Sequence, residues 1–279
     1  MAPLVLASLL VAALPAQALW KSFKTSAYIL FYPEERESQA LELLTVLEAD
    51  GAYVEESLGY RPRRIAVVLT DLGIQANGLT DPLFRRILLY PYSPSPEKGG
   101  SLASLGTVQS WWRLLWVHEY GHWTHLDMAA GAPAALRALF GNAMAPNLFA
   151  PTWLHEGICV YLESAHSRYE GRLNDGTFAA YAGVLAREQA LPSLAAATFQ
   201  DSDFPAGVGP YLYGGLFLGY LAETYGEEAL REFLRRTSSS LGSYLSPLIP
   251  ALGIDCAARR SFGRSFPALW REWQEAERR

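Results

Sequence analysis

The spacing of hydrophobic and polar positions divides the chain into a first third with strand patterns and a remainder with helix patterns. Short runs rich in aliphatic and aromatic residues predict strands, and apolar residues three and four apart predict helices. The expected strands are 24–32, 64–69 and 86–90, with a small edge strand at 99–105. The expected helices are 35–58, 107–126, 152–164, 177–189, 210–225, 227–236 and 265–279. Strands followed by helices predict an α+β fold, with a sheet-bearing lobe over about 19–126 and a helical lobe over about 127–279.

The first eighteen residues have a pattern that sets them apart from the fold. An uncharged apolar run over 4–14 precedes a small–x–small triplet that ends at Ala18. This pattern is typical of a signal peptide cleaved after Ala18, and the run is short for a membrane span. We therefore expect an exported mature chain, periplasmic or extracellular, in a compartment that permits disulfides. Even there we expect Cys159 and Cys256 to stay unpaired, because Cys159 lies in an apolar helical stretch where free cysteine behaves as a small hydrophobe.

Composition narrows the class of protein further. The chain has 279 residues, half of them hydrophobic and 18% charged, so it can bury a substantial core and does not resemble a disordered protein. Two cysteines exclude a disulfide-dense scaffold. The net charge of −5 and the absence of a Lys/Arg-rich stretch argue against nucleic acid as a partner, because phosphate contacts require basic residues.

The segment His118-Glu119-Tyr120-Gly121-His122 carries the clearest chemistry. Histidines four residues apart on a helix leave the same face, so both imidazoles can bind one Zn²⁺. Glu119 lies about 100° around the helix, where it can reach water at the metal without ligating it. Gly121 costs about 1 kcal/mol relative to alanine in mid-helix, so we expect another element to approach the helix closely there.

A catalytic zinc site needs a third protein ligand. Glu156 lies near the start of the helix expected over 152–164, and a carboxylate on a helix antiparallel to the first completes a His₂Glu triad with one open position. We therefore expect His118, His122 and Glu156 to be the ligands, with His125, His155 and Glu163 as alternatives to Glu156. For His125 a contact beside the site and a helix-end position are equally favoured. For His155 a surface position or a contact beside the ligands is favoured over ligation, and for Cys159 packing is favoured over ligation.

HEYGH followed by Pro-Thr-Trp-Leu-His-Glu-Gly over 151–157 resembles the gluzincin clan of zinc metallopeptidases, and in particular the bacterial peptidase MA-like group. The stretch 211–226 (YLYGGLFLGYLAETYG) also resembles a helix of that group, and the resemblance covers about 100–234. It implies a zincin-like metallopeptidase fold with the active-site cleft between the two lobes. It also implies Glu119 as the general base.

The resemblance leaves two features of the site open. The hydroxyl of Tyr213 or of Tyr211 is a candidate to stabilise the oxyanion of the tetrahedral intermediate, with Tyr213 slightly favoured because it adjoins the glycine pair 214–215; the alternative is that these aromatic rings pack in the core. Thermolysin-like gluzincins carry a supporting Asp four residues after the ligand Glu, and here that position is Val160. The source of any such support is therefore not indicated by the sequence.

These observations predict an exported zinc peptidase that hydrolyses a peptide or protein substrate. The edge strand at 99–105 is a candidate to pair with an extended peptide. The segment 127–151, with Asp127 and Arg137 as its charged residues, is either an apolar lip over the cleft in contact with a membrane surface or a connector with one helix at 134–140; we favour the connector. The alternative functions are a non-catalytic binding or scaffold protein on a peptidase fold and a zinc amidase acting on cell-wall peptides.

Overall fold

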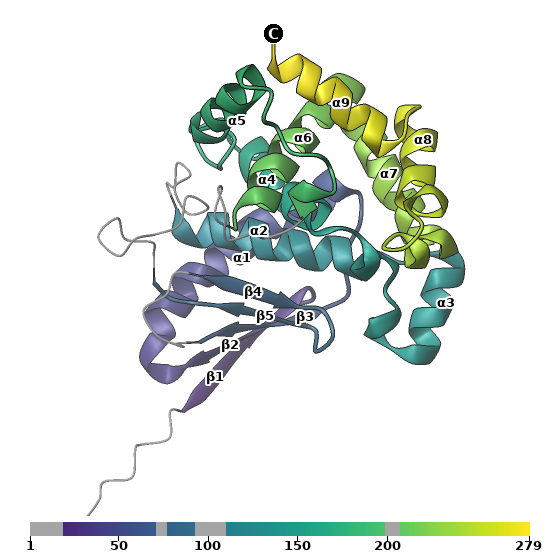
Figure 1. The fold of residues 1–279 in the computed structure, drawn as a ribbon. Coiled ribbons are helices and arrows are strands. Elements are labelled where there is room, and N and C mark those ends of the chain that lie inside the picture. The colour runs from purple at the N-terminus through teal and green to yellow at the C-terminus, as the bar shows by residue number, and fades with distance from the viewer. Residues whose placement is uncertain (1–18, 71–76, 93–109, 199–206) are drawn as a thin grey trace, which may run out of the picture.

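The computed structural model describes residues 19–70, 77–92, 110–198 and 207–279 (Figure 1). The chain is α+β, as the sequence predicts: a five-stranded mixed sheet is followed by a larger helical part. The sheet has the order β1-β2-β3-β5-β4. β2 (Tyr28–Pro33), β3 (Ile65–Leu69) and β5 (Arg86–Leu89) are parallel neighbours, whereas β1 (Trp20–Lys24) and β4 (Gly78–Asp81) are antiparallel strands at the two edges.

The sheet differs from the expectation at two places. The segment 24–32 is not one strand, because the chain reverses at residues 25–27 and pairs β1 with β2; the Thr25 hydroxyl accepts a hydrogen bond from the amide of Tyr28 in this turn. β4 was not predicted at all, because its sequence GLTD has neither the length nor the apolar alternation of a strand. The edge strand expected at 99–105 lies outside the described residues.

Two long helices separate the sheet from the rest of the molecule. After the 3₁₀ turn η1 (Glu34–Arg36) come α1 (Glu37–Leu58) and later α2 (Trp111–Asp127), which pack against each other; α1 contacts β2, and α2 contacts β4 and β5. The Ser110 hydroxyl caps α2 by accepting from the amide of Arg113. From Leu114 onward nearly every side chain of α2 is buried, because the sheet and α1 lie on one side of it and α4 on the other. A helix enclosed in this way is expected to be apolar around most of its circumference.

The remaining helices form the other part of the molecule. They are α3 (Gly131–Phe140), η4 (Asn142–Met144), η5 (Pro146–Phe149), α4 (Thr152–Ala165), α5 (Thr177–Arg187), η6 (Ala196–Thr198), α6 (Gly209–Tyr225), α7 (Glu227–Ser239), η7 (Leu241–Leu245), η8 (Pro250–Leu252), α8 (Ile254–Phe262) and α9 (Phe266–Glu277). All the helices expected from the sequence are present with small shifts at their ends, and α8 was missed. Within the described ranges, none of the helices combines the length and apolar character that a bilayer crossing requires.

Glycines bring α4 into backbone contact with α6. A Cβ at Gly157 would lie 2.6 Å from the carbonyl carbon of Gly214, and one at Gly214 would lie 2.2 Å from the carbonyl oxygen of Trp153. Larger residues at either position would therefore push the two helices apart. Gly121 has the same role between α2 and α4, because its Cβ would lie 3.0 Å from Leu162 Cδ1 and 3.2 Å from Cys159 Sγ. The close approach expected at Gly121 is confirmed.

Candidate metal centre

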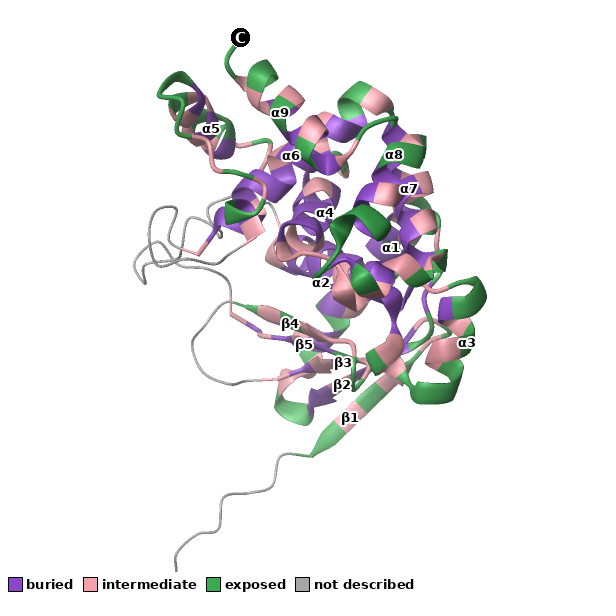
Figure 2. Cartoon of the chain, turned by 45° about the vertical axis from the view of Figure 1, so that its right-hand side comes forward, coloured by how far each residue is buried: buried purple, intermediate pink, exposed green. Residues whose placement is uncertain are grey.

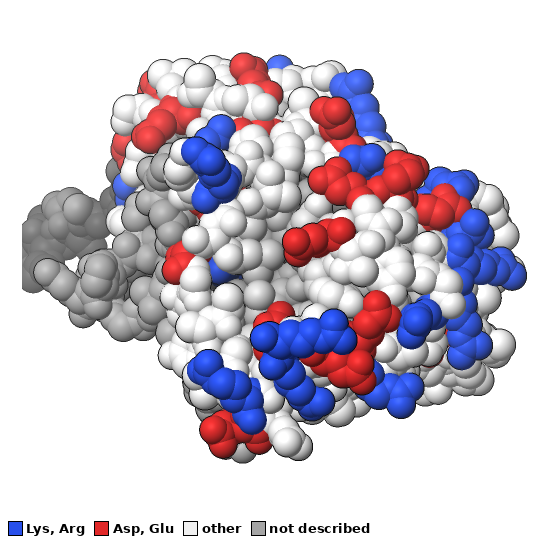
Figure 3. Space-filling model, turned by 90° about the horizontal axis from the view of Figure 1, so that it is seen from above, with Lys and Arg blue, Asp and Glu red and all other residues white. Residues whose placement is uncertain are grey.

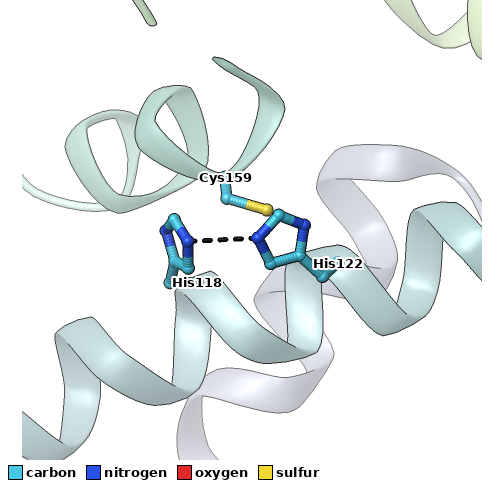
Figure 4. Close-up of side chains that lie close together, drawn as sticks. All are labelled: His118, His122 and Cys159. Atoms are coloured by element: carbon cyan, nitrogen blue, oxygen red, sulfur yellow. Dashed lines mark hydrogen bonds between the residues drawn. The ribbon is translucent and has the colours of Figure 1, made fainter. Parts of the chain in front are cut away.

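Two histidines of α2 face α4 from adjacent turns. The Nε2 atoms of His118 and His122 lie 3.1 Å apart, and their rings are nearly perpendicular, at 86° (Figure 4). His118 is buried and His122 is partly buried. With Cys159 of α4 they form a group whose ligand atoms all lie within 4.8 Å of one another, and this group could hold a metal ion.

Glu156, one turn before Cys159 on α4, lies closer to both histidines than the 4.8 Å limit within which the His118, His122 and Cys159 ligand atoms lie. Its Oε2 atom lies 3.4 Å from His118 Nε2 and 3.3 Å from His122 Nε2. Burial would raise the pKa of Glu156, but the charge of His122 and the hydrogen bonds to both histidines outweigh it and hold the pKa well below its usual range. The carboxylate is therefore ionised and aimed at the space between the two imidazoles.

Cys159 has a different environment. Its side chain is fully buried, and this burial raises the pKa of the thiol well above its usual value. Cys159 and Cys256 are both free thiols. The Sγ atom of Cys159 packs against Gly121, so its presence at the histidine pair is also explained by the contact between the two helices.

A carboxylate and a guanidinium lie at Nδ1 of His118, the ring nitrogen that does not face His122. Glu163 Oε1 lies 2.6 Å from His118 Nδ1, and Arg172 binds Glu163 through two contacts, from Nη2 to Oε1 at 2.6 Å and from Nε to Oε2 at 3.0 Å. Glu163 and Arg172 are both buried. A partner on the second ring nitrogen fixes the orientation of a metal-binding histidine and raises its basicity.

The support does not come from the position four residues after Glu156, which is Val160. Val160 instead packs toward α6, where a Cβ at Gly215 would lie 2.5 Å from its Cγ1. Glu163 was considered only as an alternative ligand. It follows Glu156 by seven residues, so the two carboxylates leave nearly the same face of α4, and this spacing was the signal that could have revealed it.

Glu119 lies against the edge strand β4. The Thr80 hydroxyl is 2.7 Å from Glu119 Oε2 and 2.8 Å from its backbone oxygen. A Cβ at Gly78 would lie 2.7 Å from Glu119 Cγ, so the strand and the side chain are in direct contact. Glu119 is buried, and its negative charge acts on both Cys159 and Tyr211, so it belongs to the same cluster as the histidines.

Of the two candidate tyrosines, Tyr211 lies at the site. Its ring stacks on that of His118 at 6.0 Å, and the Arg172 guanidinium carbon lies 5.1 Å from the ring centre. Burial, reinforced by the negative charge of Glu156, raises the pKa of Tyr211 well above its usual value. Tyr213 is part of the hydrophobic core, and burial raises its pKa as well. The geometry thus brings Tyr211, rather than the slightly favoured Tyr213, next to the histidines.

The other two histidines of these helices form a separate pair. The rings of His125 and His155 lie 5.3 Å apart, and His155 Nε2 bonds the backbone oxygen of Ala150 at 2.9 Å. Burial lowers the pKa of His155 to about 4 and that of His125 well below its usual value. Both rings are therefore neutral, and among the described residues the two nitrogens of His125 have no hydrogen-bond partner.

No protein-family model matches this chain, and a search of the curated proteins finds no match. The residues of the site are two imidazoles and three carboxylates (Glu119, Glu156 and Glu163), with the positively charged Arg172 guanidinium paired to Glu163. Such a set of donors is suited to a divalent cation.

Proposed function

We propose that this protein is a zinc-dependent metallopeptidase with a zincin-like fold, exported after cleavage near Ala18. The observation that carries the proposal is the triangle formed by His118 Nε2, His122 Nε2 and Glu156 Oε2, whose sides measure 3.1, 3.3 and 3.4 Å. Ligand atoms about 2.0–2.1 Å from a tetrahedral metal ion lie about 3.3 Å from one another, so the three atoms fit one face of a zinc tetrahedron.

Glu156 is a better third ligand than Cys159. Its Oε2 atom is nearly equidistant from the two nitrogens, at 3.4 and 3.3 Å, and the histidines hold the pKa of its carboxyl well below the usual range. An ionised carboxylate can ligate a metal ion directly, whereas a thiol must first lose its proton. Cys159 has a raised thiol pKa and a packing role against Gly121, so it does not need a metal to explain its position.

The residues around the triangle are suited to peptide hydrolysis. A zinc ion held there would supply Lewis acidity, which polarises a peptide carbonyl and lowers the pKa of water to about 7. Glu119 accepts the proton of the attacking water at its carboxylate and later passes it to the leaving amine. Thr80 holds that carboxylate from β4, which limits its rotation and keeps it apart from the ligand triangle.

Tyr211 is the residue best situated to stabilise the oxyanion. Its ring packs against both His118 and the Arg172 guanidinium, and its raised pKa keeps the hydroxyl protonated, as a hydrogen-bond donor must be. The strand most suited to bind an extended substrate is β4, which ends the described sheet and touches Glu119 through Thr80. A peptide added along its outer edge would run past the general base.

The decisive experiment compares metal content with proteolysis in matched variants. Glu119→Gln should retain about one zinc ion per chain and lose peptide cleavage by a factor of at least about 10². Glu156→Gln should lose zinc as well as activity, whereas Cys159→Ser should retain both. Glu48→Gln, an exposed carboxylate of α1, serves as the control.

The opposite results would identify the alternatives. Activity that survives Glu119→Gln would overturn the mechanism. A wild-type chain that binds zinc but cleaves no protein or peptide library would favour the scaffold, and cleavage restricted to cell-wall peptides would favour the amidase. Loss of zinc in Cys159→Ser, with zinc retained in Glu156→Gln, would assign the third ligand to the thiol.

A further inference from the structure

Large apolar side chains are exposed on three segments that lie near one another. Phe84 at the β4–β5 turn is 75% exposed, Leu139 at the end of α3 is 76% exposed, and Leu248 between η7 and η8 is 83% exposed. Their neighbours Leu83, Phe140 and Ile249 are exposed as well. We call these six residues the apolar ridge. Single exposed apolar residues are ordinary, but a group of this size commonly marks an interaction surface.

Hydrogen bonds join the three segments that carry the ridge. The side-chain amide of Asn142, just after α3, donates to the backbone oxygen of Pro82 in the β4–β5 turn at 3.0 Å. The hydroxyl of Tyr244 in η7 donates to the backbone oxygen of Met144 at 2.8 Å. Figures 1 and 2 both show α3 beside the β4–β5 turn, with exposed residues on α3. The segments that carry the ridge therefore adjoin one another.

The ridge is bordered by arginines. Apart from Arg137, residues 128–151 carry no charge, and residues 237–254 carry none. Arg85 in the turn and Arg63 and Arg64 before β3 lie close together, since Arg85 donates to the backbone oxygen of Arg64, and each of the neighbouring arginines lowers the pKa of Arg85 beyond the effect of its burial. Figure 3 shows further Lys and Arg side chains toward its right-hand margin, with Asp and Glu side chains close to them.

The acidic groups near this cluster leave part of its charge available. The Asp127 carboxylate is fully buried and pairs with both Arg63 and Arg137, and Asp81 pairs with Arg86. One carboxylate thus pairs with two arginines, which leaves a positive charge over, and Arg64 is exposed. The border of the ridge is consequently basic on a protein whose net charge is −5.

We propose that the apolar ridge docks onto the surface of an anionic lipid bilayer. Apolar side chains with a basic border are suited to this role, because the side chains enter the boundary between headgroups and acyl chains while the arginines meet anionic headgroups. A second copy of the chain is a poorer occupant. In a two-fold interface the same patch faces itself, so the arginine clusters would oppose each other.

Vesicle co-sedimentation tests the proposal on the predicted mature chain from Leu19, which contains every described element. We expect binding to vesicles of phosphatidylglycerol and phosphatidylethanolamine, and roughly tenfold weaker binding to phosphatidylcholine vesicles. The double variant Phe84→Asp/Leu139→Asp should reduce binding to the anionic vesicles by about tenfold or more, since it places two anions in the ridge. Arg64→Glu should weaken binding to the anionic vesicles without changing binding to phosphatidylcholine.

Matched controls separate the ridge from exposed apolar residues in general. Leu41 on α1 and Val184 on α5 are exposed to 51% and 50%, and Leu41→Asp/Val184→Asp should bind as the wild type does. Melting curves of all variants establish that they are folded. Wild-type protein that stays in solution with both vesicle types would overturn the proposal, as would a ridge variant that binds like the wild type. A wild-type dimer in light scattering that the ridge variant dissociates would assign the ridge to a second copy instead.

Discussion

The two groups of histidines along α2 and α4 differ in the groups that bond them, although the same helices carry both. Burial would lower the pKa of His118, but hydrogen bonds to Glu156 and Glu163 outweigh it and raise the pKa to about 9. No carboxylate bonds His125 among the described residues, so burial leaves its pKa well below its usual value. The difference between the two groups comes from the carboxylates of α4. Glu156 and Glu163 bond His118 and make that end of the α2–α4 interface attractive to a cation, whereas the end at His125 is neutral.

The largest expected effect comes from removing one imidazole from each group. His122→Gln should weaken zinc binding by on the order of a thousandfold, because it removes one of three protein ligands. His125→Gln should retain about one zinc ion per chain and lower the melting temperature, because the new amide is buried among apolar groups. Metal content after dialysis against a chelator, together with melting curves, measures both. Equal loss of zinc in the two variants would abolish the distinction between the groups.

The next effect concerns the support behind His118. Glu163→Gln should weaken zinc binding by roughly 10–100-fold, because the amide orients the imidazole less firmly and does not raise its basicity. The expected change is in metal affinity rather than in the fold, so the far-ultraviolet circular dichroism should stay unchanged. Chelator competition gives the affinity.

Glu170→Gln is the matched control for this prediction. Glu170 is also a buried carboxylate in an ion pair, but its partner is Arg113, at 3.4 Å, rather than a histidine. If both variants lost the same affinity, the effect would be a general loss of stability. If neither did, Glu163 would have no role in holding His118.

The residues of this site could be predicted from the sequence where their position along a helix was enough to indicate their role. The spacing of His118 and His122 follows from one helical turn, and the early position of Glu156 in the next helix sufficed to nominate it as a ligand. Thr80 and Arg172 could not be found in this way, because each reaches the site from a different segment through tertiary packing. The same limit applies to Tyr211, whose position next to His118 depends on how α6 crosses α4.

The fold shows a similar division. Long periodic helices such as α1 and α4 were predicted within a few residues, because fourteen or more residues of regular pattern specify them. The four-residue strand β4 was missed, because its extended conformation depends on contacts with β5 and α2 and not on its own composition. The turn at residues 25–27 was missed for the opposite reason, because apolar residues on both sides of it resemble one continuous strand.

The smallest effect, and the most direct probe of the neutral group, is the response of stability to acid. In the unfolded chain His125 binds a proton near pH 6.5, whereas in the folded chain burial, together with the neighbouring His155 of α4 and His122 of α2, keeps it neutral to a much lower pH. Below pH 6.5 the unfolded state therefore binds more protons, and the free energy of unfolding falls as the pH falls, by at most about 1.4 kcal/mol per pH unit for this one group. His125→Phe removes the contribution, so urea unfolding between pH 7 and pH 5 should show a shallower loss of stability in the variant. Equal slopes in the two proteins would mean that His125 gains a proton in the folded state as readily as in the unfolded one, and the contrast with His118 would then not be electrostatic.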